Sequence, residues 1–437
     1  MDLARTLAAN LQELQLHKPD LEAWRFDLHE TKGVELGLKN NRLGGPYSAP
    51  SYKRSVSGEL YLIWKGNRYT SAKLDSQVIS AFNEYTDLWQ TTAYCDEDGV
   101  GLYKPEKIPT LELADPQAKQ IVHHDFQVPY QLLEDGLKKL TGYGAAKVDG
   151  KVRCFETHRS IVNSADLVVE YAQTPCEFFF EINDSYGEVY HEKKWPAPFQ
   201  IDRIINNTGQ IGVQLSQTPV SANLSGPILL IFPPSMFEAF LSYYLISNLY
   251  GGLVINRQSR FSLADFQNRR PVLREDLNLE VNVLLPYRSF SYPCTSEAAP
   301  GGSLTFIAGG RLQTPILNLK YAKKAGLNPT PIPNGGKGFF LKSASSAGTW
   351  EQLISETENA LIVYSILGLH TQDSSSGVFS LTADQCLLVK NGKVQGKTKA
   401  VINGDFLGSL CQSASKFGFM EGEDNPGYAF WANCAIC

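Results

Sequence analysis

Hydrophobic and polar positions follow two different periods along the chain, and the period separates predicted helices from predicted strands. Residues 1–16 carry leucines three to four positions apart, at Leu7, Leu11 and Leu14 among others, which is the spacing of an amphipathic helix. Four segments between residues 151 and 195 are instead typical of strands: KVRCFETHR, DLVVEYAQ, CEFFFEIND and GEVYHEKKW. We therefore expect a helix first and a strand-rich region later in this half of the chain.

Turn residues divide the rest of the first half. Residues 59–74 predict a β-hairpin around Gly66-Asn67, because this pair tolerates positive φ angles. Strand-like segments also cover residues 21–29 and 33–39. Residues 95–120 contain Pro105, Pro109 and Pro116 with little periodicity, so they predict a linker.

A polar, turn-rich stretch near residues 218–226 marks the predicted domain boundary, giving domains at 1–220 and 221–437. The second domain begins with a buried strand and a predicted helix at 234–250, ended by Gly251-Gly252. Beyond it the pattern is mostly β, with an Asn391-Gly392 hairpin and a late helix at 404–417. The predicted fold class is α+β: an N-terminal mixed α/β layer domain followed by a β-rich, barrel-like C-terminal domain.

Composition narrows the class of protein. The 437 residues carry 40 Lys and Arg against 45 Asp and Glu, so no basic excess favours a nucleic-acid partner. The N-terminus lacks the basic start and apolar run of a secretory signal. The most apolar stretch, 228–255, is interrupted by Pro233-Pro234 and by Glu238, which disfavours a membrane span. These features predict a cytoplasmic protein with no membrane partner, whose eight cysteines stay reduced.

Candidate metal and catalytic motifs are incomplete. The His29-Glu30 and His191-Glu192 pairs have no second histidine at metal-ligand spacing, and both are interpreted as surface residues. Cys154 and His158 share a strand face, but a second ligand pair is missing. Cys434 and Cys437 form a CxxC at the end of the sequence, which we interpret as a frayed or edge-strand tail whose role is open.

Several segments, taken in order, resemble the TldD/PmbA family, on its PmbA (TldE) side. The hairpin ELYLIWKGNRYTSAKLD and the segment Arg159–Ser164 are similar to N-terminal family elements. The region Cys294–Gly302 retains Glu297 but otherwise departs from the family's acidic stretch. The matching C-terminal segments are Trp350–Ile354, Ser376–Ser380, Leu388–Lys393 and Asn403–Leu407.

The resemblance implies which residues to compare with the family's metal site. TldD-type subunits carry HExxxH on the helix that resembles the one after Pro233, and its two histidines bind the catalytic metal. Glu238 matches the motif glutamate, whereas Phe237 and Ser242 stand at the histidine positions. Phenylalanine has no lone pair and a serine hydroxyl is a poor zinc ligand. The resemblance therefore implies no catalytic, cofactor-binding or metal residue in this chain, with zinc or a similar divalent metal in a partner subunit.

The function that this resemblance implies is that of a non-catalytic TldE/PmbA-like subunit. It would pair with a metal-bearing TldD-like chain as a heterodimer that cleaves unfolded or leader peptides. The strand-rich composition suggests that the peptide pairs with a strand edge. Two alternatives stay open: a homodimeric peptide-binding or scaffold protein without a proteolytic role, and an independent hydrolase with an unrecognised site.

Overall fold

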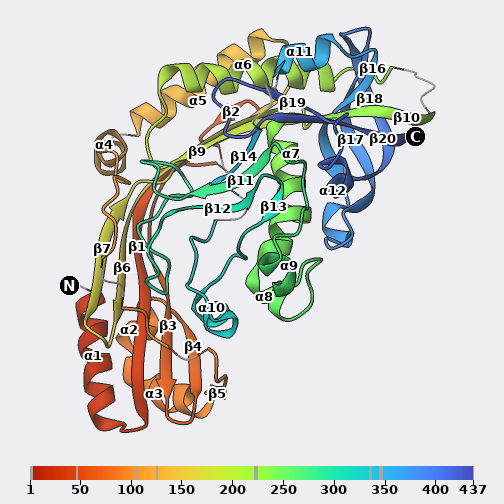
Figure 1. The fold of residues 1–437 in the computed structure, drawn as a ribbon. Helices are drawn as coiled ribbons and strands as arrows, with labels where there is room; N and C mark the ends of the chain where they lie inside the picture. Colours follow the sequence, from red (N-terminus) through yellow and green to blue (C-terminus); the bar gives the residue numbers. More distant parts are fainter. Residues whose placement is uncertain are drawn as a thin grey trace.

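A computed structural model describes residues 3–45, 48–99, 101–104, 107–124, 126–220, 225–333, 337–343 and 348–436. Figure 1 shows a long, bent sheet in the first half of the sequence and a barrel in the second, with a small sheet between them. Mixed helices and strands with a closed barrel confirm the predicted α+β class. No helix in the described ranges has the length and apolar character needed to cross a bilayer.

The first sheet contains nine strands in the order β5-β4-β3-β1-β6-β8-β9, with β2 paired to β1 and β7 to β6. Both predicted segments at 21–39 belong to one 19-residue strand, β1, which pairs along its length with β6. The strands are β1 (Leu21–Lys39), β2 (Arg42–Leu43), β3 (Ser51–Trp64), β4 (Arg68–Leu74), β5 (Tyr94–Cys95), β6 (Val148–Asn163), β7 (Leu167–Gln173), β8 (Cys176–Ile182) and β9 (Tyr186–Glu192).

Two groups of helices cover two stretches of this sheet, so β1 contributes to two separate cores. Trp24 and Phe26 pack with the leucines of the first helix, whereas Val34 and Leu36 pack with the later helices. The first group is α1 (Leu3–His17), α2 (Ser76–Ser80) and α3 (Phe82–Thr91). The second is α4 (Pro116–His124), α5 (Gln127–Gly142) and α6 (Pro198–Leu215).

The predicted linker at 95–120 is helical at its end, because α4 begins at Pro116. Proline suits a first helical position, where its missing N–H loses no bond, and Asp115 Oδ2 accepts a hydrogen bond from Ala118 N at 3.0 Å.

The domain boundary predicted at 220/221 adjoins residues 221–224, which lie outside the described residues, and it stays a prediction.

The C-terminal half contains a five-stranded barrel that closes because β10 pairs with both β16 and β20. Around the barrel, β10 and β16 are parallel and the other neighbours are antiparallel. β15 and β19 extend the sheet beyond β20. The strands are β10 (Ser225–Phe232), β15 (Gly348–Thr349), β16 (Asn359–Leu367), β17 (Val378–Lys390), β18 (Lys393–Asp405), β19 (Lys416–Phe419) and β20 (Gly427–Ile436).

The helix predicted at 234–250 exists but changes its winding. It begins as α7 (Pro234–Phe240), continues as a π-helical turn over Leu241–Ile246 and ends in a 3₁₀ turn over Ser247–Leu249. Gly251 does not cap it; instead α8 (Gly251–Ile255) begins there. The remaining elements are α9 (Leu263–Gln267), α10 (Leu319–Ala325), α11 (Trp350–Ser355), the 3₁₀ turn Leu369–Thr371 and a four-stranded sheet of β11 (Leu277–Asn282), β12 (Ser303–Ala308), β13 (Arg311–Leu312) and β14 (Phe339–Ser343).

Two C-terminal predictions are wrong. The late helix predicted at 404–417 is only the single turn α12 (Phe406–Ser409), because Gly404 and Asp405 extend β18 by pairing with Phe379 and Val378. The CxxC is not a frayed or edge-strand tail over its described part. Cys434 is buried in β20 and pairs in register with Gly226 of β10 and Ile402 of β18, while Cys437 lies outside the described residues.

Candidate functional site

A cavity of about 1000 Å³ lies where the nine-stranded sheet meets the C-terminal half. From the first half it is lined by residues 185–192 and by Arg203 and Asn207 of α6. From the second half the lining includes Glu238 of α7, Tyr364 of β16 and the segments around Arg288, Phe339, Trp350 and Glu423. The candidate site is therefore built by elements that are far apart in the sequence.

Ion pairs across the cavity wall join the two halves. Arg203 Nη1 of α6 lies 3.0 Å from Glu423 Oε1, which precedes β20. Arg288 bridges the same two regions, with Nε 2.8 Å from Glu192 Oε1 and Nη1 3.0 Å from Asp424 Oδ1. Two arginines thus form ion pairs with three of the cavity's carboxylates.

Glu188, at the middle of β9, has neutral hydrogen-bond partners. Its Oε1 accepts a hydrogen bond from Tyr186 Oη at 2.8 Å, and its Oε2 accepts one from Asn207 Nδ2 at 3.3 Å. Burial raises the pKa of Glu188 to about 7, against the opposing effect of these two donors. A carboxyl group of this kind changes charge near neutral pH.

Glu238 is held by a rigid amide at the other side of the cavity. Asn425 Nδ2 donates to Glu238 Oε1 at 3.0 Å and to the carbonyl of Phe339 at 2.9 Å, while Asn425 Oδ1 accepts from Leu341 N at 2.9 Å. Burial raises the pKa of Glu238; the Asn425 bond opposes this, and the charges of Glu423 and Asp424 add to it. The carboxyl group thus has a fixed position and a reduced tendency to ionise.

Phe237 and Ser242, which stand at the histidine positions of HExxxH, lie in different surroundings. Phe237 is fully buried, with its ring centroid 5.0 Å from that of Tyr428 and 6.1 Å from that of Phe406. Ser242 is partly buried and does not line the cavity. Within the described ranges, no three His, Cys, Asp or Glu side chains are grouped so that they could hold a metal ion. Phe237 and Ser242 therefore do not supply the two ligands that the HExxxH histidines supply in TldD-type subunits.

The other sequence candidates separate in the structure. Cys154 is buried with its Sγ 3.2 Å from Cys176 Sγ, whereas the exposed His158 lies beside Glu156. His191 and Glu192 were interpreted as surface residues; His191 is exposed and Glu192 is partly buried, and both line the cavity, where Glu192 pairs with Arg288. The sequence does not show that these two residues line a cavity. That follows from the position of β9 at the edge of the sheet, which depends on its pairing with β8.

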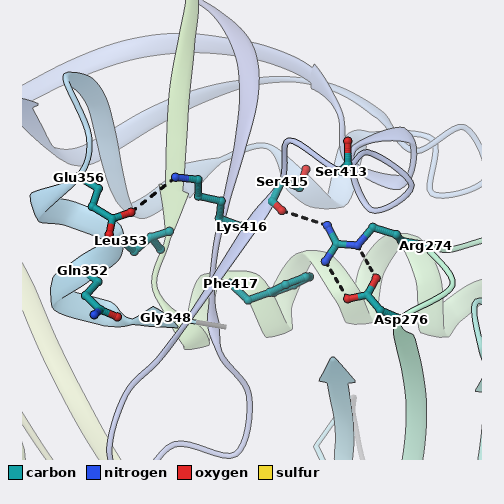
Figure 2. Close-up of a pocket in the computed structure, with 10 residues that line it drawn as sticks. All are labelled: Arg274, Asp276, Gly348, Gln352, Leu353, Glu356, Ser413, Ser415, Lys416 and Phe417. Atoms are coloured by element: carbon teal, nitrogen blue, oxygen red, sulfur yellow. Dashed lines mark hydrogen bonds and ion pairs between the residues drawn. The ribbon is translucent and has the colours of Figure 1, made fainter. Parts of the chain in front are cut away.

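A second cavity, of about 570 Å³, is shown in Figure 2. Its charged groups are paired among themselves: Arg274 Nη2 donates to Asp276 Oδ2 at 3.0 Å, and Lys416 Nζ lies 3.7 Å from Glu356 Oε2. Arg274 also donates to the Ser415 carbonyl at 3.1 Å. This cavity offers fewer uncommitted groups to a ligand than the larger one.

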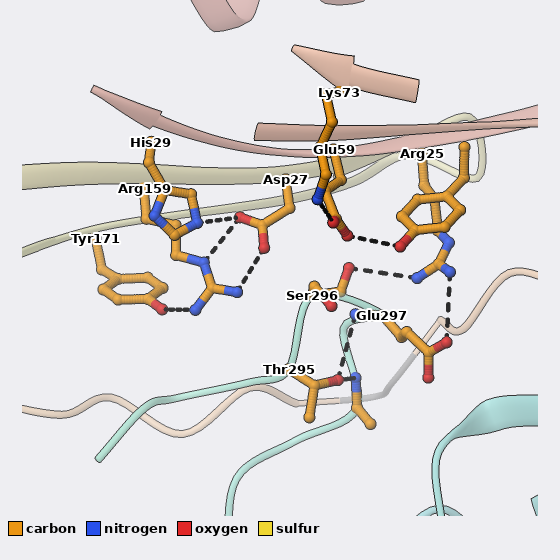
Figure 3. A network of polar contacts seen from close by, with 12 residues as sticks. Arg25, Asp27, His29, Glu59, Lys73, Arg159, Tyr171, Thr295, Ser296 and Glu297 are labelled. Carbon is orange, nitrogen blue, oxygen red and sulfur yellow. Dashed lines mark hydrogen bonds and ion pairs between the residues drawn. The ribbon is translucent and has the colours of Figure 1, made fainter. Parts of the chain in front are cut away.

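A polar network fixes the segment around Glu297 against the long sheet (Figure 3). Arg25 Nη2 lies 3.4 Å from Glu297 Oε1, and Glu297 Oε2 accepts a hydrogen bond from Leu319 N at 2.9 Å. The Arg25 guanidinium also lies 4.0 Å from the centroid of the Tyr61 ring. Glu297, the residue retained from the family's acidic stretch, therefore holds β1 to the C-terminal half and does not line the cavity.

The architecture defines an α+β protein in which a long sheet and a closed five-stranded barrel meet at a charged cavity. Residues 225–418 match the PmbA/TldA metallopeptidase C-terminal domain. This match places the C-terminal domain of the chain in the TldD/PmbA family. No match emerges from a comparison with curated proteins.

Solved structures share this fold over the whole chain. TldE from Thermococcus kodakarensis is 18% identical, with a TM-score of 0.79 over 98% of this chain and 100% of that one. A candidate modulator of DNA gyrase from Bacteroides thetaiotaomicron is 16% identical, with a TM-score of 0.76 over 100% of both chains. Another, from Thermotoga maritima, is 15% identical, with a TM-score of 0.79 over 99% of this chain and 100% of that one.

Proposed function

We propose that this chain is a TldE-like, non-catalytic subunit of a two-chain metallopeptidase that cleaves unfolded or leader peptides. The observation that carries the proposal is the position of Phe237. Its ring lies inside the aromatic core, where the family's first histidine ligand would be, so the residue next to the cavity-lining Glu238 cannot bind a metal that would activate water. Catalysis then requires a metal-bearing, TldD-like partner, and a cytoplasmic location stays a prediction from the sequence.

The helix that contains Glu238 is not the surface that the partner contacts. Phe240, Leu241, Tyr244 and Leu245 are all buried within this chain, although their apolar character also suits an interface. Their burial supports a structural role for this helix beneath the cavity. The proposed partner therefore binds elsewhere on the surface.

Co-expression with an HExxxH-bearing relative tests the proposal. We expect a heterodimer by light scattering, about one equivalent of divalent metal per heterodimer, and cleavage of an unstructured peptide that neither chain cleaves alone. Cleavage by this chain alone would support the independent hydrolase, and failure to assemble would contradict the subunit role.

A second candidate function is favoured by the large cavity, because this chain forms it without a partner. A homodimeric peptide-binding protein without a proteolytic role would use the same cavity and need no metal-bearing partner. It would bind peptide tightly, form a homodimer, and leave the peptide intact even after mixing with the HExxxH-bearing chain.

A further inference from the structure

The outer edge of β9 is open toward the cavity. All eight residues from Ser185 to Glu192 line this cavity. Successive side chains of a strand point to opposite faces, so a space lined by every residue must border the backbone edge. Over Tyr186–His191, β8 is the only partner strand within the described ranges. Contact on the outer side begins at Glu192, which forms a bridge with Arg288.

This edge lacks three features that commonly protect an exposed strand. Edge strands are commonly blocked by lysine, proline or a β-bulge. The sequence of β9, YGEVYHE, contains neither lysine nor proline, and its register with β8 runs without a shift from Tyr186 to Glu192. Val189, which is 53% exposed, adds an apolar contact at the middle of the strand. An extended backbone can therefore pair with β9 without any rearrangement of the sheet.

The charges around this edge favour a cationic ligand. Six carboxylates and four lysine or arginine side chains line the cavity. Arg203 and Arg288 are engaged by Glu423, Glu192 and Asp424. Glu188 and Glu238 have only neutral hydrogen-bond donors, and neither forms an ion pair within the described ranges. The positive charge of Lys337 acts on Glu238 without an ion pair, so it offsets only part of the negative potential.

We propose that the cavity binds an extended peptide segment as an added strand along β9, with one basic side chain of the peptide between Glu188 and Glu238. This rests on the proposed function, because it specifies the peptide substrate and the subunit that holds it. Backbone pairing supplies affinity for varied sequences, and the two carboxylates add a preference for lysine or arginine at one position.

Peptides with methylated backbone nitrogens test the pairing. The probe is a fluorescein-labelled, unstructured eight-residue peptide with one central arginine, and fluorescence anisotropy measures its binding to the purified full chain. N-methylation removes one N–H donor at a time. We expect losses of about tenfold or more at alternate positions, because only every second residue of an added strand faces β9. Equal affinity for all methylated peptides, or no binding of the parent peptide, would overturn the inference.

Replacing the central arginine tests the charge preference. We expect binding to weaken by roughly tenfold when this arginine becomes glutamine, and further when it becomes glutamate. The double variant Glu188→Gln/Glu238→Gln should remove the preference and keep the backbone-methylation pattern. Glu170→Gln on β7 is the matched control, because Glu170 is exposed and lies outside the cavity. A preference that survives in the double variant contradicts the assigned carboxylates.

These measurements separate the inference from the proposed function. Peptide binding by the isolated chain can succeed even if no metal-bearing partner assembles with it, in which case only the subunit role fails. Assembly and cleavage can also succeed when binding of the probe is insensitive to backbone methylation, in which case only the β9 site fails.

Discussion

Arg159 of β6 donates two hydrogen bonds to Asp27 of β1, from Nε to Oδ1 at 2.8 Å and from Nη2 to Oδ2 at 2.6 Å (Figure 3). Both side chains are largely buried, and His29 Nε2 lies 3.0 Å from the same Oδ1. Burial alone raises the pKa of Asp27, but the bonds from Arg159 and His29 outweigh it and lower the pKa to about 2. The pair therefore stays ionised across the ordinary pH range.

Removing the charge of Asp27 should destabilise the fold. In Asp27→Asn the buried Arg159 guanidinium loses its counter-charge, so we expect the free energy of unfolding to fall by about 3–5 kcal/mol in urea titrations at pH 7. Asp202→Asn is the control, because the Lys139–Asp202 pair is about half exposed and its loss should cost less than about 1 kcal/mol. A similar small effect in both variants would contradict the structural role of the Asp27–Arg159 pair.

Glu188 should reduce stability as the pH rises through neutrality. Its pKa is raised from 4.5 to about 7 in the folded state, so the folded protein binds the proton more tightly than the unfolded chain does. The contribution of Glu188 to stability is then greatest below pH 4.5, falls as the pH rises from 4.5 to about 7, and levels off above that. Glu188→Gln removes this ionisation and should raise the free energy of unfolding at pH 8 by on the order of 1–3 kcal/mol.

Several titratable and polar groups face Glu188 and could contribute to the same pH dependence. They are Tyr186 on its own strand, Arg203 and Asn207 on α6, Tyr364 on β16 and Glu423 before β20. The stabilisation by Glu188→Gln should shrink as the pH falls from 8 to 5, whereas Glu170→Gln should show no such trend. A gain that is independent of pH would mean that ionisation of Glu188 is not its cause.

The purified chain should contain no stoichiometric metal. Phe237 cannot coordinate, and Ser242 lies outside the cavity. Elemental analysis of protein purified without added metal should give well below one equivalent, and added zinc should leave the melting temperature unchanged. About one equivalent of zinc, retained in Glu238→Gln but lost in Cys154→Ala/His158→Ala, would instead assign a metal site to the Cys154 region.

Thiol accessibility tests the position of Cys434. In a Cys437→Ser variant seven cysteines remain, and among them Cys95 and Cys411 are exposed whereas the other five are buried. Two thiols should therefore react rapidly with a thiol reagent, and five should react only after denaturation. A third rapid thiol that disappears in Cys434→Ala would show that the end of β20 opens in solution.

Local signals were predictable from the sequence, and pairing between distant segments was not. The hairpin at Asn391-Gly392 is confirmed, because both residues adopt positive φ in a two-residue turn between Lys390 and Lys393. The helix predicted at 404–417 is wrong, because pairing with β17 extends β18 through Asp405. Propensity counts only neighbouring residues, so it cannot detect a strand that is stabilised by a partner elsewhere.

In the candidate site, too, a residue in a local motif could be predicted from the sequence, whereas a residue whose role depends on distant segments could not. Glu238 was identified through the family resemblance to a short motif on one helix, and the structure places it in the cavity. Glu188 was missed, because nothing in GEVYHEKKW distinguishes an edge strand from a central one. Its pKa is raised by burial and by the nearby charge of Glu423, and only the packed fold creates this environment.

The pairing that closes the barrel also sets the order in which the protein can fold during synthesis. Phe232 of β10 pairs with Tyr428 of β20, so about 200 residues must be made between the first and last strands of the barrel. At typical rates of about 5–20 residues per second, β10 waits roughly 10–40 seconds for β20, although its other neighbour β16 is made earlier. The nine-stranded sheet is complete by Glu192 and can form on the ribosome much earlier. Until both neighbours are made the apolar β10 has an unpaired edge, so we expect ribosome pausing after residue 232 to lower the yield of folded protein.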